Sequence, residues 1–300
     1  MSLPLQPLFA EALQANVPLA PYTSARIGGP ADQLLICRSG ESLRDALQTC
    51  WRNQIPFTLL GGGSNVLVSD LGIRGLVIIN KAKETRLVPG QQPRAWAESG
   101  VNFGRFCHQL AEAGLGGLEW GATVPGTVGG AVYGNAGAYG GDIAGSLAFA
   151  TLITPDGELT CDAGQMGYAY RSSVLKRGEL KAVILAAEFN LKNDDPASIK
   201  NTIDILTTKR RASQPPGASM GSMFKNPEGD HAGRLIEACG LKGARVGNAE
   251  ISPVHGNFIV NHGNTLAADV KALIDLAREA VQQKFGISLH LEVEMIGEWK

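Results

Sequence analysis

The sequence predicts an α+β chain of two domains, and three observations support this fold class. Segments with the apolar spacing of amphipathic helices alternate with short apolar segments typical of strands. A polar, proline-containing stretch, KNDDPAS at residues 192–198, interrupts this pattern late in the chain. Glycine accounts for 38 of the 300 residues, roughly twice the usual share, and it gathers in a few segments. We therefore expect two packed domains whose glycine-rich turns have a special purpose.

The first part of the chain contains helices and strands in turn. Residues 42–52 repeat apolar side chains at helical spacing, and a second helix of this kind begins near Phe103. Between these helices, we expect strands at residues 56–60, 75–80 and 94–100. Two further strands follow the long glycine-rich stretch, in SLAFATLITPDGEL and in KAVILAAEFNL at 181–191.

The polar stretch at 192–198 predicts a boundary between a first domain, residues 1–195, and a second, residues 196–300. The first is expected to have two lobes that divide near residue 80. In the second, we expect helices over 199–206, 235–239 and 266–281, a strand within 256–261, and a closing strand in ISLHLEVEMIG. Gly240 marks the end of the middle helix, since glycine favours the position after a helix.

Charge and cysteine content exclude several classes of function. The chain has 27 basic and 28 acidic residues and a pI near 6.5, so nothing global predicts a nucleic-acid or membrane partner. The five cysteines are scattered without a CxxC pair, and the histidines show no ligand spacing. These patterns predict no metal site and a reduced, cytoplasmic compartment. We also expect a monomer.

Two glycine-rich segments are candidates for binding a phosphate group. The first, GGGSN at residues 61–65, lies between two predicted strands, where glycine lets several backbone N–H groups approach an anion. The second, VPGTVGGA at 124–131, is a possible second wall against the same ligand. Neither has the spacing of a P-loop or of an ordinary Rossmann turn. The alternative is that these glycines serve only tight turns and close packing.

Seven segments together resemble one known family. They are TSARIGGPAD, GGGSNVLVSD, VPGTVGGAVYGNAGAYGGDI, YAYRSS, GSMFKNP, HGNFIVN and LEVEMIG. In order and spacing they are similar to UDP-N-acetylenolpyruvoylglucosamine reductase, in its shorter type II form. The resemblance extends from about residue 20 to the end of the chain. It implies a two-lobed FAD-binding domain of the vanillyl-alcohol-oxidase (PCMH) type, followed by a smaller α+β substrate-binding domain.

The resemblance also implies an activity. The family reduces the enolpyruvyl group of UDP-N-acetylenolpyruvoylglucosamine to UDP-N-acetylmuramate, a step of peptidoglycan synthesis on which cell-wall formation, cell shape and division depend. NADPH would donate a hydride to noncovalently bound FAD, and the enolpyruvyl double bond would then receive it. Since no second dinucleotide site is visible, NADPH and the sugar nucleotide are expected to use one cleft in turn. The expected partner is therefore a small-molecule UDP-sugar.

Three residues match the family's catalytic positions. Arg171 in YAYRSS presents a planar cation suited to a carboxylate. Ser222 in GSMFKNP is the expected proton donor, with Lys225 and Asn226 nearby in sequence. Glu292 in LEVEMIG is expected to polarise the intermediate.

Spacing alone does not separate Glu292 from Glu294, which would share one face of the closing strand. Glu294 also stands where the family more often has a basic residue. We expect Glu292 to be the functional carboxylate and Glu294 to face solvent.

The remaining site residues also follow from the resemblance. The expected FAD-binding residues belong to the two glycine-rich segments and their continuation: Gly61, Gly62, Gly63, Ser64, Asn65, Pro125, Gly126, Thr127, Gly129, Gly130, Asn135 and Gly137. The expected substrate-binding residues are Tyr170, Arg210, Lys225, Asn226 and Asn257.

Two other interpretations remain open from the sequence. A flavin oxidase of the same fold, acting on an alcohol or a sugar lactone, would share the glycine turns. Such oxidases often attach their flavin to a His or Cys near the first glycine turn, and the residues around 61–65 offer neither. A non-enzymatic nucleotide-binding protein would explain the glycine turns but not Arg171, Ser222 and Glu292.

Overall fold

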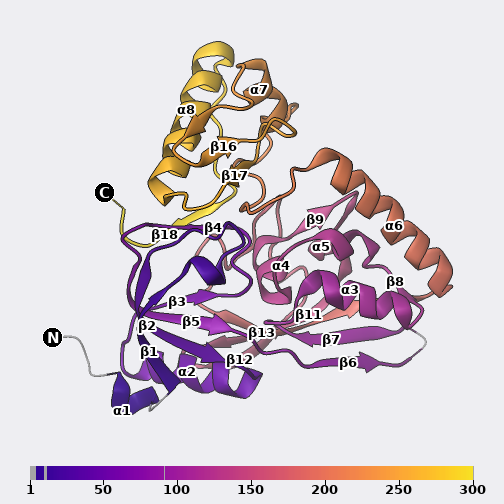
Figure 1. Cartoon of the computed structure of the whole chain (residues 1–300). Helices are drawn as coiled ribbons and strands as arrows, with labels where there is room; N and C mark the ends of the chain where they lie inside the picture. The colour runs from indigo at the N-terminus through magenta and orange to yellow at the C-terminus, as the bar shows by residue number, and fades with distance from the viewer. Residues whose placement is uncertain (1–4, 10–11, 91, 300) are drawn as a thin grey trace. The chain divides into compact units, whose positions relative to one another are not determined.

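The structure is a computed structural model that describes residues 5–9, 12–90 and 92–299. It shows a mixed α+β architecture, with several small sheets and helices on their faces (Figure 1). In the described part of the chain, no helix combines the length and the apolar character needed to cross a membrane.

The described residues form two compact units. Unit 1 takes the described residues up to Leu13 together with 35–62 and 78–209, and unit 2 takes 14–34, 63–77 and the residues from Arg210 onward. Residues 14–34 and 63–77 thus belong to the same compact unit as the last third of the chain. The expected functional division at 195/196 stays a prediction.

Unit 1 is built on a five-stranded antiparallel sheet in the order β12-β11-β13-β7-β6. The register places Ala187 of β13 opposite Ala97 of β7 and Ala150 of β11. The elements that lie wholly in this unit are α1 (Gln6–Phe9), α2 (Gly40–Arg52), β3 (Phe57–Leu60), β6 (Thr85–Val88), β7 (Arg94–Glu98), α3 (Phe103–Glu112), β8 (Leu115–Gly116), η3 (Glu119–Thr123), α4 (Val128–Gly134), β9 (Gly137–Ala138), β10 (Gly141–Asp142), α5 (Ile143–Ser146), β11 (Leu147–Thr154), β12 (Gly157–Cys161), β13 (Val183–Asn190) and β14 (Lys192–Asn193).

The core of unit 1 lies between this sheet and the helices above it in Figure 1. Phe103 and Phe106 of α3 are buried against Phe189 of β13, with ring centroids 6.0 Å apart in each pair. Val128 and Val132 of α4 belong to the same buried cluster. This packing fixes the start of α4, which begins within the second glycine-rich segment.

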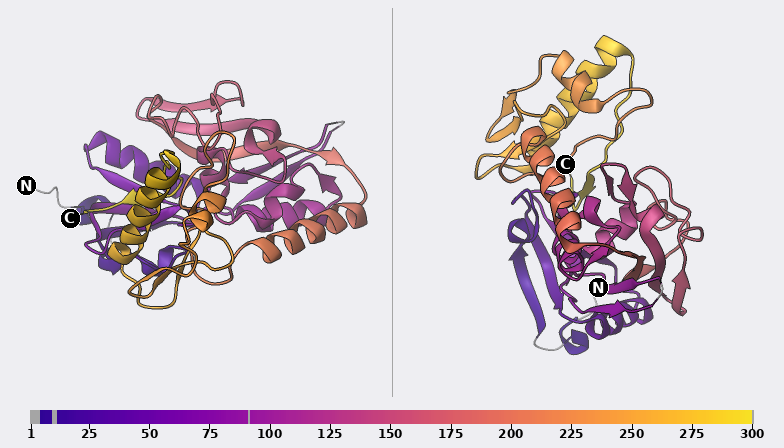
Figure 2. Two further views of the ribbon diagram at one scale, coloured as in Figure 1. Left: turned by 90° about the horizontal axis from the view of Figure 1, so that it is seen from above. Right: turned by 90° about the vertical axis from the view of Figure 1, so that its right-hand side faces the viewer.

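Four elements run from one unit into the other: β1 (Leu13–Pro18), β2 (Pro30–Cys37), β5 (Ile73–Asn80) and α6 (Pro196–Ser213). The strands belong to a sheet of order β1-β2-β5-β3. The first turns of α6, the orange helix in both views of Figure 2, pack on the end of α3, because Ile199 and Ile203 are buried with Ala111.

Unit 2 contains an antiparallel sheet of order β15-β16-β17, and a helical pair packs on it. Its elements are η2 (Ala20–Tyr22), β4 (Val66–Val68), α7 (Ala232–Ala238), β15 (Arg245–Val246), β16 (Ala249–Ile251), β17 (Ile259–Asn261), α8 (Ala267–Phe285) and β18 (Glu294–Ile296). A long-range contact starts α8: the Asp70 carboxylate accepts hydrogen bonds from the N–H groups of Ala267 (2.7 Å) and Ala268 (2.9 Å). Gly286, with φ of +70°, ends it.

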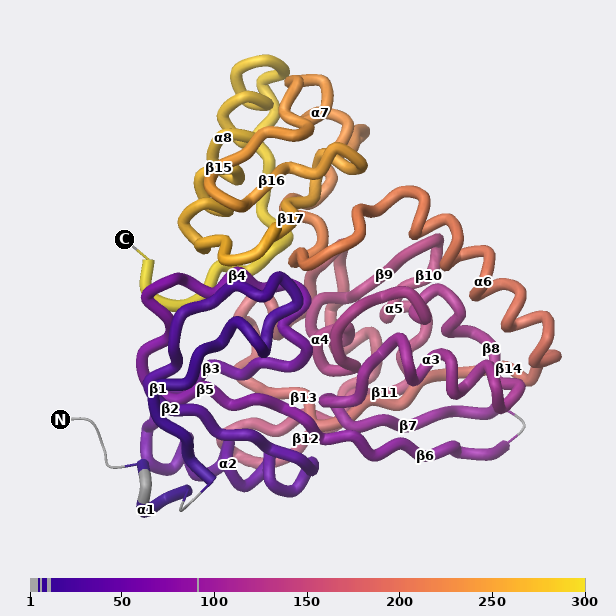
Figure 3. The backbone as a smooth tube through the Cα atoms, viewed as in Figure 1, coloured from indigo at the N-terminus to yellow at the C-terminus, as the bar shows by residue number. Residues whose placement is uncertain are grey.

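The predicted helices are confirmed, with ends shifted by a few residues, but the predicted closing strand is wrong in its extent. Only Glu294–Ile296 forms a strand, which pairs in parallel with β4 as Figure 3 lets the reader follow. The preceding residues hydrogen-bond to the Ser222 segment instead: Lys225 N–H donates to His290 O, and Glu292 N–H donates to Met223 O, both at 2.9 Å. The backbone of His290 and Glu292 thus bonds to the Ser222 segment and not to a neighbouring strand of a sheet.

Candidate active site

The two glycine-rich segments meet within unit 1. A Cβ on Gly62 would lie only 2.9 Å from the Cα of Gly126, and a Cβ on Gly61 would collide with Thr127 Oγ1. Gly126 has φ of +105°, which favours glycine. Backbone therefore packs on backbone here. The structure brings these segments together, whereas their binding of FAD stays a prediction.

The N–H groups of Gly129 and Gly130, later in the second segment, already donate hydrogen bonds within the chain. The N–H of Gly129 donates to Ser99 O at 2.8 Å, and that of Gly130 donates to Thr127 Oγ1 at 3.3 Å. A Cβ on Gly129 would also lie 2.8 Å from Ser99 Cβ. Close packing thus accounts for Gly129, and the N–H of Gly130 bonds to the cap of α4, while contact of either residue with FAD stays a prediction. The N–H groups around Gly126 are better candidates for an anion.

Two buried polar atoms next to the second segment fit a polar cofactor. Within the described residues, Trp120 Nε1 and Thr123 Oγ1 are buried without a hydrogen-bond partner. Buried polar groups are nearly always paired, so such atoms call for an explanation. FAD carries many donors and acceptors that suit them. Sequence reasoning missed both residues, although Thr123 directly precedes the VPG turn.

A second part of unit 1 gathers four of the predicted residues. Arg171 Nη2 donates to Gly137 O at 2.8 Å and Nη1 donates to Asn135 O at 3.4 Å. The guanidinium also lies 5.2 Å from the ring centroid of Tyr170, whose side chain is exposed. Arg171 has φ of +54°, a left-handed conformation that is uncommon outside glycine and often accompanies functional sites.

Asn135 has a clear structural task in the same region. It ends α4 with φ of +46°, its Nδ2 donates to Ala169 O at 3.1 Å, and its Oδ1 accepts from Ala144 N–H at 3.0 Å. The side chain therefore links α4 to the segment before Arg171. This bonding supports the shape of the site, and a direct contact of Asn135 with FAD stays a prediction.

In unit 2, Asn257 holds the segment that carries Ser222. Its backbone oxygen accepts from Met223 N–H at 2.9 Å. Its side chain pairs with both backbone groups of Phe224: Oδ1 accepts from the N–H at 2.9 Å, and Nδ2 donates to the oxygen at 2.8 Å. Asn257 was expected to bind substrate, and that role stays a prediction. These three bonds make it a structural support of the Ser222 turn.

The segment of Glu292 lies beside the same turn. Glu292 N–H donates to Met223 O, and Asn65 Nδ2 donates to Glu292 O, both at 2.9 Å. The expectation that Glu292 and Glu294 share one strand face is wrong, because only Glu294 belongs to β18. Glu294 is half-buried rather than solvent-facing. Asn65, expected at FAD, uses its amide to fix the backbone of Glu292.

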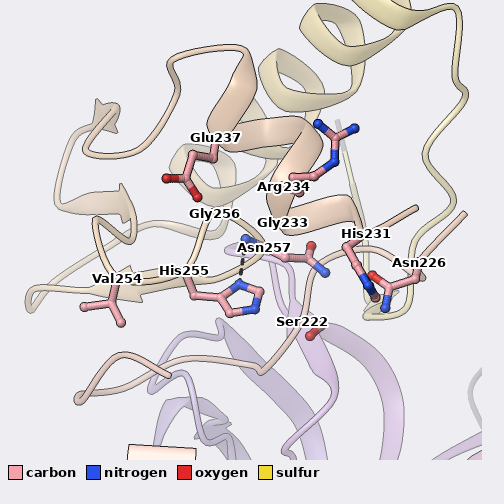
Figure 4. A pocket seen from close by; sticks show the side chains of 10 residues that line it. All are labelled: Ser222, Asn226, His231, Gly233, Arg234, Glu237, Val254, His255, Gly256 and Asn257. Carbon is pink, nitrogen blue, oxygen red and sulfur yellow. Dashed lines mark hydrogen bonds between the residues drawn. The ribbon is translucent and has the colours of Figure 1, made fainter. Parts of the chain in front are cut away.

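A pocket of about 270 Å³ opens next to Ser222 in unit 2 (Figure 4). Asn226 and Asn257 line it together with Ser222, so the structure brings together three of the predicted residues. Asn226 Oδ1 accepts from Ala232 N–H at 3.1 Å, at the start of α7. Arg210 and Lys225 do not line this pocket. The other lining residues are His231, Gly233, Arg234, Glu237, Val254, His255 and Gly256.

Comparisons with protein families match both parts of the chain. The family described as "FAD binding domain" matches residues 31–162. The family described as "UDP-N-acetylenolpyruvoylglucosamine reductase, C-terminal domain" matches residues 213–296. These matches confirm the predicted fold class and the order of an FAD-binding region followed by a second domain.

Individual relatives match almost the whole chain. A UDP-N-acetylenolpyruvoylglucosamine reductase of Chloroflexus aggregans is 41% identical over 289 residues, which cover 95% of this chain and 97% of the relative. The protein with the same name from Bacillus subtilis is 41% identical over 286 residues, covering 94% and 93%. A crystal structure of UDP-N-acetylenolpyruvylglucosamine reductase from Thermus caldophilus has a TM-score of 0.80 at 34% identity, over 94% of this chain and 98% of that one.

Proposed function

Since this chain belongs to the UDP-N-acetylenolpyruvoylglucosamine reductase family, we propose that Arg171, Ser222 and Glu292 perform its chemistry. The chain is an FAD-dependent oxidoreductase that reduces the enolpyruvyl group of the UDP-sugar in peptidoglycan synthesis. The observation that supports the residue roles most directly is the hydrogen bond from Glu292 N–H to Met223 O, which holds the Glu292 segment beside Ser222.

The backbone of Gly61, Gly62 and Gly126 is proposed to hold the FAD pyrophosphate, with Ser64 and Pro125 beside it. The close backbone contact between the two turns supports this role, and the buried Thr123 hydroxyl offers a further hydrogen bond. FAD held there would supply the hydride-transfer chemistry between NADPH and the enolpyruvyl double bond.

Arg171 is proposed to bind the substrate carboxylate. Addition of a hydride to the double bond moves negative charge towards that carboxylate, so a fixed cation stabilises the charge as it develops. Two carbonyl acceptors, on Asn135 and Gly137, hold the guanidinium in one orientation. Such preorganisation means that little reorganisation is needed during the reaction.

Ser222 is proposed to donate a proton to the carbon next to the site of hydride addition. The Oγ–H bond breaks, a C–H bond forms, and the electron pair of the enolate becomes that C–H bond. A free serine is a weak acid, so positive charge and hydrogen bonds must stabilise its alkoxide. Lys225, three residues on, is the proposed source of that charge, while Glu292 is proposed to polarise the intermediate.

The remaining roles are proposed from the family pattern. Tyr170, Arg210, Lys225 and Asn226 would contact the sugar nucleotide, and Arg210 suits its diphosphate. NADPH would use the same cleft before the UDP-sugar enters it, which predicts ping-pong kinetics. We place the reaction in the cytoplasm, in agreement with the free thiols of all five cysteines, and expect a monomer.

The experiment that tests Ser222 separates the two halves of the reaction by stopped-flow absorbance. In Ser222→Ala, bleaching of the bound flavin by NADPH should stay within about twofold of wild type. Return of its colour on addition of the enolpyruvyl sugar should slow by roughly 10²- to 10⁴-fold, typical of losing a positioned general acid, or about 3 to 5.5 kcal/mol of barrier.

Ser288→Ala is the matched control. Ser288 is an exposed serine of unit 2 whose hydroxyl only donates to Gln282 Oε1 at 2.8 Å. Both half-reactions should be normal in this variant. If Ser222→Ala slowed both halves equally, or neither, Ser222 would not be the proton donor.

A further inference from the structure

We propose that His255 is a positioning residue for Ser222, acting through the backbone and side chain of Asn257. The proposal rests on the proposed function of Ser222 as proton donor. It concerns a histidine for which the sequence indicates only a structural or solvent-exposed role. Figure 4 shows His255 and Ser222 lining one pocket, with the hydrogen bond from His255 towards Asn257 drawn as a dashed line.

The imidazole is hydrogen-bonded to the backbone of Asn257. Its Nδ1 accepts a hydrogen bond from Asn257 N–H at 3.1 Å. Ser252 anchors the loop before it, because Ser252 Oγ accepts from the N–H groups of Val254 (3.0 Å) and His255 (3.3 Å). The ring therefore fixes the backbone of Asn257 from a loop that is itself anchored.

Asn257 transmits this constraint to the Ser222 turn. It is 3% exposed, and its three hydrogen bonds to Met223 and Phe224 leave the turn little freedom. A backbone bridge also pairs Ser222 with Phe258, the residue after Asn257. A rotation of the Asn257 peptide would thus displace Ser222.

Tight packing holds the ring in its place. The His255 ring meets the Phe258 ring edge-on, with centroids 4.9 Å apart. On the other side, a Cβ on Gly233 would lie 2.8 Å from His255 Cε1, so α7 presents a glycine where any side chain would strike the ring. These two contacts hold the imidazole beside Asn257, while the ring also borders the pocket.

The accepting role of Nδ1 requires the neutral ring with its proton on Nε2. Burial lowers the pKa of His255 and the charge of Lys242 lowers it further, while a hydrogen bond with the backbone of His255 itself and the charge of Glu237 oppose this change. Arg234 of α7 and His231 before it also line the pocket, and the guanidinium of Arg234 pairs with the Asp230 carboxylate. Once protonated, Nδ1 carries a hydrogen and no longer accepts the Asn257 N–H. Proton donation by Ser222 should therefore fail as the pH falls through a value below the ordinary histidine pKa.

Two substitutions separate hydrogen bonding from packing. In His255→Asn, Oδ1 is attached to Cγ as Nδ1 is in histidine, so it can still accept from Asn257 N–H. In His255→Leu, the side chain fills space but accepts nothing. We measure both half-reactions by stopped-flow absorbance from pH 5 to 8, and FAD content reports correct folding.

His255→Leu should slow return of flavin colour by the enolpyruvyl sugar about 10- to 100-fold, since a small misplacement of a reacting group has costs of this order. Bleaching by NADPH should stay within about twofold. His255→Asn should recover most of the lost rate and lack the decline at low pH. His108→Asn and His108→Leu, on the exposed face of α3, should change neither half-reaction.

The proposal is overturned if His255→Leu matches wild type, if both half-reactions slow equally, or if His255→Asn keeps the decline at low pH. If His255→Leu does not fold, the pH profiles of wild type and His255→Asn still decide the question. Ser222→Ala separates the two proposals: slowing in that variant but not in His255→Leu would refute only the role of His255. No slowing in Ser222→Ala would refute the proposed function itself.

Discussion

The glycine turns of unit 1 and the Ser222 turn of unit 2 achieve rigidity by opposite means. In the first, Gly62 and Gly126 bring two backbones into direct contact, and the requirement is the absence of side chains. In the second, the side chain of Asn257 clamps Phe224 and the ring of His255 clamps Asn257. A turn built from glycine is recognised in its own sequence, whereas a turn held by side chains depends on residues about thirty positions away.

This difference predicts different responses to mutation. Any side chain added to a glycine contact must displace backbone, so the effect should be nearly complete. Removing a clamp from the Ser222 turn leaves the turn in place but looser, so the effect should be graded and confined to the step that needs its geometry.

The largest expected effect comes from Gly62→Val. The new Cβ would lie within 2.9 Å of Gly126 Cα, so the two turns must separate, and FAD retention should be lost. The measurement is the visible flavin absorbance of the purified variant. We expect it to fall to the order of a few per cent of the wild-type value. Gly134→Ala is the control, because a Cβ on Gly134 meets nothing within 4 Å. Full flavin occupancy in Gly62→Val would refute the placement of the FAD pyrophosphate against these two turns.

Glu292→Gln should lower turnover by about 100-fold, the usual effect of removing one group that stabilises developing charge. Glu294→Gln should leave turnover within about threefold, since Glu294 lies in β18, two residues beyond the segment bonded to the Ser222 turn. Steady-state NADPH oxidation measures both. A large effect of Glu294→Gln with a small effect of Glu292→Gln would show that the functional carboxylate is Glu294.

Arg171→Lys should reduce kcat/KM by about 10- to 100-fold, because an ammonium group cannot donate to Asn135 O and Gly137 O while it also presents a planar fork to a carboxylate. Initial rates with the enolpyruvyl sugar measure this loss. Arg177→Lys is the control: Arg177 lies on the same segment and pairs with Glu179 at 2.6 Å near the surface. Equal rates in both variants would place Arg171 outside the site.

The smallest expected effect concerns stability and not chemistry. Asp70→Ala removes the carboxylate that caps α8 and should lower the free energy of unfolding by about 1 to 2 kcal/mol. For a chain of this size, thermal melting should shift down by roughly 2 to 4 °C per kcal/mol. Asp275→Ala, which removes a surface pair with Lys271 on the same helix, should shift melting by less than about 2 °C. An equal shift in both variants would contradict the capping role.

Much of the fold was predictable because its signals are local. The spacing of Leu43, Ala46, Leu47 and Cys50 marks α2, and these four side chains are buried. Gly240, with φ of +74°, follows α7 as predicted. The order of motifs such as GGGSN and GSMFKNP indicated the family, which the 41% identity to a relative confirms.

Only the tertiary structure decided how the Ser222 turn is supported. The alternation in LHLEVEMIG is that of a strand, yet the backbone of His290, Glu292 and Val293 bonds to the Ser222 turn, and only Glu294–Ile296 forms the strand β18. His255 and Asn65 carry no local sign of their contacts with Asn257 and Glu292. Periodicity and turn chemistry act between neighbours in sequence, so the sequence alone determined helices, glycine turns and motifs. Hydrogen bonds between distant segments exist only once the chain has folded, because folding itself brings their donors and acceptors within 3 Å of one another.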